Sequence, residues 1–105
     1  MEQISTLEYP KQITNKGYVR INIEGEWILE HVYICQCQLG RKLKKEEVCH
    51  HLNFCKQDNR INNLMVFPNQ KEHQKFHNKL KRYGYYTNPM KRQILNRWNL
   101  EKDEI

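Results

Sequence analysis

The chain has 105 residues and a formal net charge of +6, and 38% of its residues are hydrophobic. The mean hydropathy of −0.97 leaves material for only a modest core, and no apolar run approaches the ~18 residues that a membrane span needs. These values predict one domain over residues 1–105 with no membrane span, and the charge favours a polyanionic partner, either nucleic acid or a membrane surface.

The N-terminus is polar and contains acids, unlike a secretory signal peptide. This predicts an intracellular, cytoplasmic location, where disulfide bonds are rare. The four cysteines are Cys35, Cys37, Cys49 and Cys55. They include no CxxC pair, so buried or free thiols are favoured over a structural zinc site, and the zinc site stays an alternative.

The first half of the chain predicts a β-hairpin followed by a short helix. Residues 1–15 are expected to be irregular. Val19, Ile21 and Ile23 alternate with polar residues, which is typical of a half-buried strand, and the turn signal "EGE" leads into a second strand. The run "EHVYICQCQLG" predicts a helix that ends at Gly40.

The second half predicts a strand, a loop, a second strand and two helices. The strands lie within 47–54 and 62–67. Asn69 is the expected N-cap of a helix that ends at Gly84. A basic tail over residues 81–105 contains a last helix, with Asn88 as its cap, Pro89 at its first position, and Met90, Ile94 and Trp98 on one face.

Four of the five histidines lie within residues 46–80: His50, His51, His73 and His77. His73 and His77 are one helical turn apart, which stacks their rings as a clamp for a metal ion; the alternative is a solvated polar helix. His50 and His51 are adjacent on a strand, so their side chains point to opposite faces. One ring can therefore bind a metal while the other takes a proton from water, as metal-assisted hydrolysis requires.

The segments "EVCHH", "DNRINNL" and "EHQKFH" resemble, in this order, the HNH endonucleases, which are ββα-metal nucleases. The upstream "GYVRINI…EHVYICQCQLGRKL" is similar to the lead-in of the phage type. The resemblance covers residues 16–80. It implies an α+β fold with a ββα-metal core, preceded by a β-hairpin and short helix and followed by a C-terminal helix. It also implies a metal-dependent DNA endonuclease of phage or mobile-element (homing endonuclease) origin. A monomer carries a single site, so nicking is the default.

The resemblance implies a role for each matched residue. His51 matches the general base, and His50, His73 and His77 match the ligands of one divalent metal. Asn63 matches the residue that pins the loop by side-chain hydrogen bonds and so orients the base. Arg60 is a candidate to hold a phosphate. Relatives often carry Gly where Phe54 stands, and Phe54 is expected to disfavour a positive φ.

Three imidazoles favour zinc, manganese or nickel over a hard ion. Magnesium is also allowed, because substrate phosphate adds oxygen ligands.

Clustered cations are expected to contact DNA phosphates, and neighbouring tyrosines to stack on bases or sugars. The cations are Arg41, Lys44, Lys45, Lys79, Lys81 and Arg82. The alternative is that they solvate exposed turns. The expected partner is DNA, and the chain is a monomer or a homodimer. His31, the remaining histidine, is expected to pack or cap. Two other functions stay open: a non-catalytic nucleic-acid-binding or structural module on a degenerate HNH fold, and a regulator stabilised by zinc on the cysteines.

Overall fold

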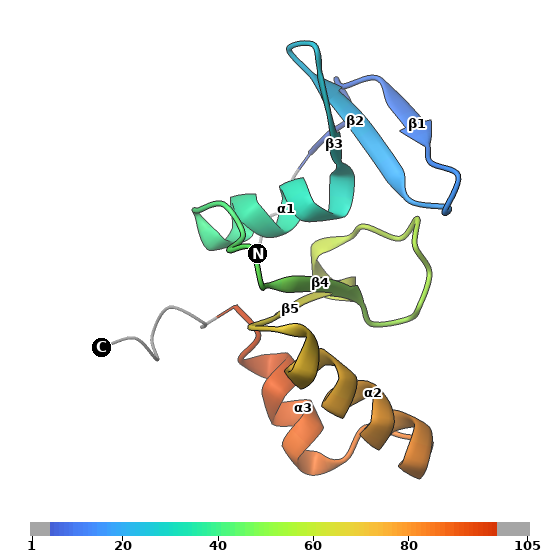
Figure 1. Ribbon diagram of the computed structural model, residues 1–105, viewed down its shortest axis with the longest axis vertical. Coiled ribbons are helices and arrows are strands. Elements are labelled where there is room, and N and C mark those ends of the chain that lie inside the picture. The colour runs from blue at the N-terminus through green and yellow to red at the C-terminus, as the bar shows by residue number, and fades with distance from the viewer. Residues whose placement is uncertain (1–4, 99–105) are drawn as a thin grey trace. The chain divides into compact units, whose positions relative to one another are not determined.

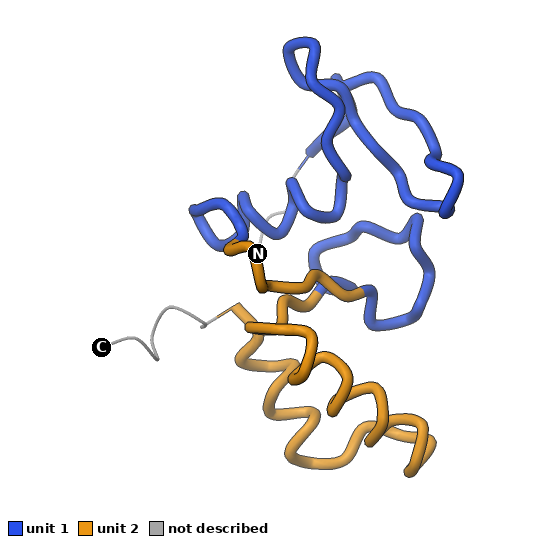
Figure 2. Tube along the Cα trace, in the orientation of Figure 1, with its two compact units in different colours: residues 1–43, 51–64 blue, residues 44–50, 65–105 orange. Residues whose placement is uncertain are grey.

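The structure is a computed structural model that describes residues 5–98. The chain forms two compact units, which Figure 2 shows in different colours. Unit 1 takes the residues up to 43 together with 51–64, and unit 2 takes 44–50 together with the residues from 65 onward. Strands and helices both occur (Figure 1), so the predicted α+β class is confirmed. The assignment of residues 1–105 to a single domain stays a prediction.

Unit 1 contains an antiparallel sheet in the order β1-β2-β3 (Figure 1). Its strands are β1 (Lys11–Ile13), β2 (Val19–Ile23) and β3 (Glu26–Leu29). The predicted hairpin is present, with Ile21 opposite Ile28. Its turn places Glu24 and Gly25 at φ 52° and 93°. Tight hairpin turns require such positive φ values, which glycine adopts without steric cost.

Strand β1 corrects the expectation that residues 1–15 are irregular. Lys11 pairs with Ile21, and Ile13 pairs with Val19. All three residues of β1 are exposed, so this strand forms by backbone pairing along the edge of β2 and not by burying one face. A strand of that kind has no hydrophobic alternation, and the sequence therefore carried no signal for it.

Helix α1 (Glu30–Leu39) follows β3 directly and confirms the predicted helix. It ends at Gly40, whose φ of 74° is left-handed and whose N–H donates to the carbonyl of Gln36. The helix packs on β2 and β3 of the same unit. Its buried residues include Glu30 and His31 in the first turn, so a carboxylate and an imidazole lie inside unit 1.

The loop after His51 ends in a short 3₁₀ helix, η1 (Ile61–Asn63). Phe54 in this loop has φ 62°, so the expectation that it disfavours a positive φ is wrong. Its N–H donates to the carbonyl of His51 at 3.1 Å, which closes a tight turn, and its side chain is 55% exposed. Phe54 therefore carries a steric cost that a glycine at this position would avoid.

The next elements follow one another in the order of a ββα unit. They are β4 (Val48–His51), β5 (Leu64–Phe67) and α2 (Gln70–Tyr83). β4 and β5 form a two-stranded sheet. The Asn69 side chain accepts from the N–H of Glu72 at 2.9 Å, and Gly84 with φ 76° ends α2, so both predicted helix boundaries are confirmed. The core of unit 2 holds β5 side chains together with Phe76 and Met90.

Helix α3 (Asn88–Leu95) is shorter than expected and starts one residue earlier. Thr87, not Asn88, occupies the N-cap position, so Pro89 is the second residue of the helix and not the predicted first. Asn96 is the C-cap, and both its side chain and its backbone N–H donate to the carbonyl of Arg92. Trp98 therefore lies beyond the helix, and the predicted extension over residues 99–105 lies outside the described residues.

Between residues 5 and 98, no helix has the length and apolar character of a candidate membrane span. The cytoplasmic location stays a prediction.

Candidate active site and metal centre

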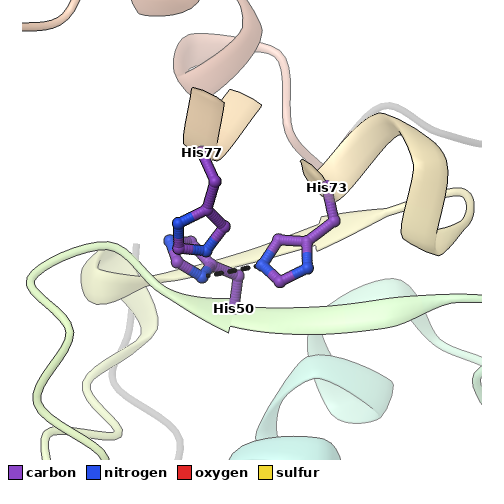
Figure 3. A group of neighbouring side chains, drawn as sticks. All are labelled: His50, His73 and His77. Carbon is purple, nitrogen blue, oxygen red and sulfur yellow. Dashed lines mark hydrogen bonds between the residues drawn. The ribbon is translucent and has the colours of Figure 1, made fainter. Parts of the chain in front are cut away.

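Unit 2 brings together the imidazoles of His50, His73 and His77 (Figure 3). His50 comes from β4, and the other two come from successive turns of α2. The ring centroids are 4.9 Å apart for His50–His73, 4.6 Å for His50–His77 and 4.5 Å for His73–His77. One nitrogen of each ring lies within 4.8 Å of the others, and the His73 Nε2 atom is 3.1 Å from His50 Nδ1.

The rings converge because of the local fold. Pro68 and the Asn69 cap start α2 directly after β5, and the helical repeat then places His73 and His77 on one face. Two aromatic side chains lie under the group. Phe67 is 6.0 Å from the His50 ring and 5.2 Å from the His73 ring, and Phe76 is 6.3 Å from the His50 ring. The imidazoles of His50 and His73 therefore pack against buried apolar side chains.

The protonation state of His73 favours metal binding. Burial lowers the pKa of His73, and the neighbouring His77 lowers it further. A lowered pKa keeps the ring neutral at physiological pH, and only a neutral imidazole offers a lone pair to a metal. His50 is buried, whereas His73 and His77 are half-buried, so the group is open to solvent on the α2 side.

The donor set fits a single divalent ion. Zinc binds histidine nitrogen at about 2.0–2.1 Å, so three tetrahedral ligands lie roughly 3.3 Å from one another. The 3.1 Å separation of His73 Nε2 and His50 Nδ1 is of this size. Three protein ligands also leave a position for water or substrate, as in catalytic zinc sites. Among residues 5–98, these three histidines are the one group of three or more side chains placed so that they could bind a single metal ion.

His51 lies in unit 1 and has different neighbours. Its Nε2 atom is 2.6 Å from Asn59 Oδ1, and Asn59 Nδ2 donates to Glu30 Oε1 at 2.9 Å. The other oxygen of Glu30 accepts from the Thr6 hydroxyl and the Lys11 ammonium. His51, Asn59, Glu30 and Thr6 are all buried, so these hydrogen bonds are shielded from water.

A second imidazole packs beside His51 in the same unit. The His31 ring lies 4.9 Å from the His51 ring and stacks on Tyr18 at 5.1 Å. The pKa of His31 falls to about 4, because burial and then the nearby His51 disfavour its charged form while Glu30 opposes them. The neutral ring of His31 is thus a packing partner, which is the role that the sequence favoured.

The side chain of Asn63 forms hydrogen bonds to the loop that follows His51. Its Nδ2 atom donates to Asn53 Oδ1 at 2.9 Å and to the carbonyl of Asp58 at 2.8 Å, and its Oδ1 atom accepts from the N–H of Asn53 at 3.0 Å. These are loop-pinning bonds of the kind that the resemblance implies. The side chain that contacts His51 is that of Asn59, so any effect of Asn63 on His51 passes through the loop.

Sequence reasoning did not single out Glu30, and it treated Asn59 only as part of the loop motif. Both carried a signal, because Glu30 opens the "EH" of the lead-in and Asn59 is the middle residue of "DNR". What the sequence did not show was that these residues meet.

The exposed guanidinium of Arg60 forms an ion pair with Asp58. Its Nε and Nη2 atoms donate to the two carboxylate oxygens of Asp58 at 2.8 and 2.9 Å. This pairing lowers the pKa of Asp58 to about 2. Binding of a phosphate by Arg60 requires exchange of this partner or a shared arrangement, and the role of Arg60 stays a prediction.

The other basic residues that were predicted to contact DNA stay predictions, and the structure gives the solvent exposure of each side chain. Arg41 is half-buried and donates to the carbonyl of Lys42, and the others are exposed: Lys44, Lys45, Lys79, Lys81 and Arg82. Lys81 lies one turn beyond His77 on α2, on the face that carries the imidazoles.

A hollow of about 600 Å³ in unit 1 offers a further basic surface. Lys16 and Arg20 line it together with Tyr18, and no acidic residue takes part in its lining. The Lys56 ammonium lies 5.0 Å from the centroid of the Tyr18 ring, which is also 6.3 Å from the ring of His51.

The cysteines do not form a cluster that could hold a metal within residues 5–98. Cys35 is buried in the core, whereas Cys37 and Cys55 are exposed. The interpretation of the cysteines as thiols stays a prediction.

The model of a known protein family matches the central part of the chain. It is described as HNH endonuclease and covers residues 29–74, from the end of β3 into α2. His50, His51, Asn63 and His73 lie inside the matched segment, and His77 lies just outside it. No match was found among curated proteins or among solved structures. Over these residues the chain is similar to the HNH endonuclease family.

Proposed function

We propose that this protein is a metal-dependent endonuclease that hydrolyses a phosphodiester bond of DNA, cutting one strand per event. The observation that carries the proposal is the convergence of the imidazoles of His50, His73 and His77 in unit 2. The residue that follows His50 in the sequence, His51, is held in a buried hydrogen-bond network of unit 1. The family match supports a nuclease-type enzyme.

His50, His73 and His77 would hold one divalent ion, with zinc, manganese or nickel favoured by the nitrogen donors and magnesium allowed. When bound, such an ion stabilises negative charge on a phosphoryl oxygen and on the leaving oxygen. The chain's own part is to hold three ring nitrogens together before substrate arrives. The buried side chains of Phe67 and Phe76 lie beside the ring of His50.

His51 is the proposed general base. It takes a proton from the attacking water while the new bond to phosphorus forms and the 3′ oxygen leaves. Its ring is held by the hydrogen bond to Asn59 and by packing against His31, so it needs little reorganisation when the proton arrives. Asn63 supports this arrangement indirectly, through the loop that follows His51.

DNA is the proposed partner because the chain carries a net charge of +6 and its cations gather on α2 and in the hollow of unit 1. A single set of catalytic residues in one chain favours nicking, and a double-strand break would require two chains. Origin in a phage or other mobile element is part of the same proposal.

The test is cleavage of supercoiled plasmid with Mg²⁺, Mn²⁺, Zn²⁺ or Ni²⁺. Wild type is expected to convert the plasmid to the open-circular form with at least one of these ions, and His51→Ala to abolish conversion while binding the same amount of metal. Gln74→Ala, on an exposed position of α2, is the matched control and is expected to retain activity. Retarded migration without cleavage under every metal would instead support the non-catalytic binding module.

A further inference from the structure

The buried hydrogen-bond network of unit 1 holds the side chain of His51 in place. It also determines which nitrogen of the His51 ring carries the proton. We propose that Glu30 and Asn59 act as positioning residues that fix His51 with its proton on Nε2, which leaves Nδ1 as the atom that accepts the proton of water. The proposal deepens the proposed function and rests on it for the role of His51. The tautomer itself is measurable without any activity.

The first step concerns the orientation of the Asn59 amide. An asparagine presents an oxygen that only accepts and an NH₂ group that only donates. Glu30 Oε1 lies 2.9 Å from one end of the amide, and a carboxylate only accepts, so this end must be the NH₂ group. The oxygen of Asn59 is then the end that faces His51.

The second step fixes the proton on the imidazole. Asn59 Oδ1 lies 2.6 Å from His51 Nε2, and because this oxygen only accepts, Nε2 must donate. A neutral imidazole has one N–H and one lone pair, so a proton on Nε2 leaves the lone pair on Nδ1. A ring flip would put a carbon where Nε2 stands and leave a buried amide oxygen without its donor.

The third step is that Glu30 stays ionised. Burial opposes its charge, but Asn59, Lys11 and Thr6 all donate to the carboxylate, and together they bring its pKa below the ordinary value. A protonated Glu30 would be able to donate to Asn59 and so permit the reverse orientation of the amide. Because the three donors keep Glu30 ionised, Asn59 must donate to Glu30 and accept from His51.

The arrangement follows the logic of catalytic triads, in which a third group orients the base and stabilises its charged form. Here an amide stands between the imidazole and the carboxylate. When Nδ1 receives the proton of water, His51 becomes a cation whose Nε2–H already points at an oxygen.

The direct test is nuclear magnetic resonance of metal-free, ¹⁵N-labelled full-length protein at a pH where its histidines are neutral. Long-range ¹⁵N–¹H correlations distinguish a protonated from an unprotonated ring nitrogen, and His51→Gln assigns the signals of His51. We expect a single tautomer with the proton on Nε2 in wild type. A proton on Nδ1, or a mixture of tautomers in wild type, would overturn the proposal.

Two variants test the positioning residues. Asn59→Leu and the milder Glu30→Gln are expected to give mixed tautomers at His51 and to lower plasmid nicking by about 10–100-fold, as loss of an orienting partner does. Bound metal per chain should stay at the wild-type amount. Asn78→Leu, the same change at an exposed position of α2, is the matched control and should alter neither readout.

The outcomes separate the two proposals. If wild type nicks plasmid but Glu30→Gln folds, keeps one tautomer and nicks at the wild-type rate, the positioning role is wrong while the nuclease stands. If wild type never nicks and yet shows the Nε2–H tautomer, which Glu30→Gln then loses, the network is as proposed and the nuclease assignment is wrong. Circular dichroism identifies a variant that fails to fold, and the wild-type spectrum then decides.

Discussion

His50 and His51 are neighbours in the sequence, yet their surroundings differ in kind. The ring of His50 meets two other imidazoles above phenylalanine side chains, with no carboxylate in the group. The ring of His51 meets an amide that is itself bonded to a buried carboxylate. The first environment offers several lone pairs to a cation, whereas the second orients a single lone pair. The surroundings thus suit one histidine to metal binding and the other to accepting a proton.

The largest expected effect compares the two environments directly. His51→Ala and His73→Ala should each reduce nicking by about 10²-fold or more, because one removes the base and the other a ligand. Only His73→Ala should lose bound metal, which elemental analysis of the purified proteins measures. Loss of metal in both variants, or in neither, would contradict the division of labour between the two groups.

The second effect is the acid sensitivity of unit 1. His31 has a pKa near 4 when folded and an ordinary value of 6.5 when unfolded. The unfolded chain therefore binds the extra proton first, so the free energy of unfolding should fall as the pH drops from about 6.5 to 4, by about 3 kcal/mol in total.

The matched variant for this effect is His31→Phe, which keeps an aromatic ring against Tyr18 and removes the titrating group. Urea unfolding of metal-free protein across this pH range measures both proteins. The difference in stability between them should change by about that amount, and parallel curves would show that His31 does not titrate as inferred.

The third effect is stabilisation of unit 2 by metal. An ion that binds only the folded state at 100 times its Kd raises the free energy of unfolding by about 2.7 kcal/mol. Thermal unfolding with and without zinc measures this gain. His77→Ala should lose it and His51→Ala should keep it, whereas a gain that survives removal of His77 would place the ion elsewhere.

The smallest effect concerns DNA contacts on α2. Lys81 follows His77 by one turn, and Arg82 points away from that face because each residue turns the helix by roughly 100°. Lys81→Gln should weaken DNA binding a few-fold and reduce the slope of log K against log salt by about 1, as loss of one phosphate contact does. Arg82→Gln should have less effect in the same titration, and equal effects would argue against this face.

The sequence predicted most of what local rules govern. The spacing of His73 and His77, the Asn69 cap, and the glycines that end α1 and α2 all follow from neighbours a few residues away. It did not predict the exposed strand β1, which forms by backbone pairing alone, or the early end of α3 at Asn96.

The hydrogen bond between Glu30 and Asn59 joins residues that are 29 positions apart. No periodicity or local motif reports a contact of that kind, because it depends on how α1 packs against the loop after β4. Polar networks inside a fold are therefore the part of a site that sequence patterns show least.

X-ray absorption of the zinc-loaded protein tests the central claim most directly, because it reports the atoms bound to the ion. The account predicts one zinc per chain with three imidazole nitrogens at about 2.0–2.1 Å, a lighter oxygen or nitrogen atom at the remaining position, and no sulfur. A spectrum dominated by sulfur at about 2.3 Å would place the metal on the cysteines and contradict the assignment of His50, His73 and His77.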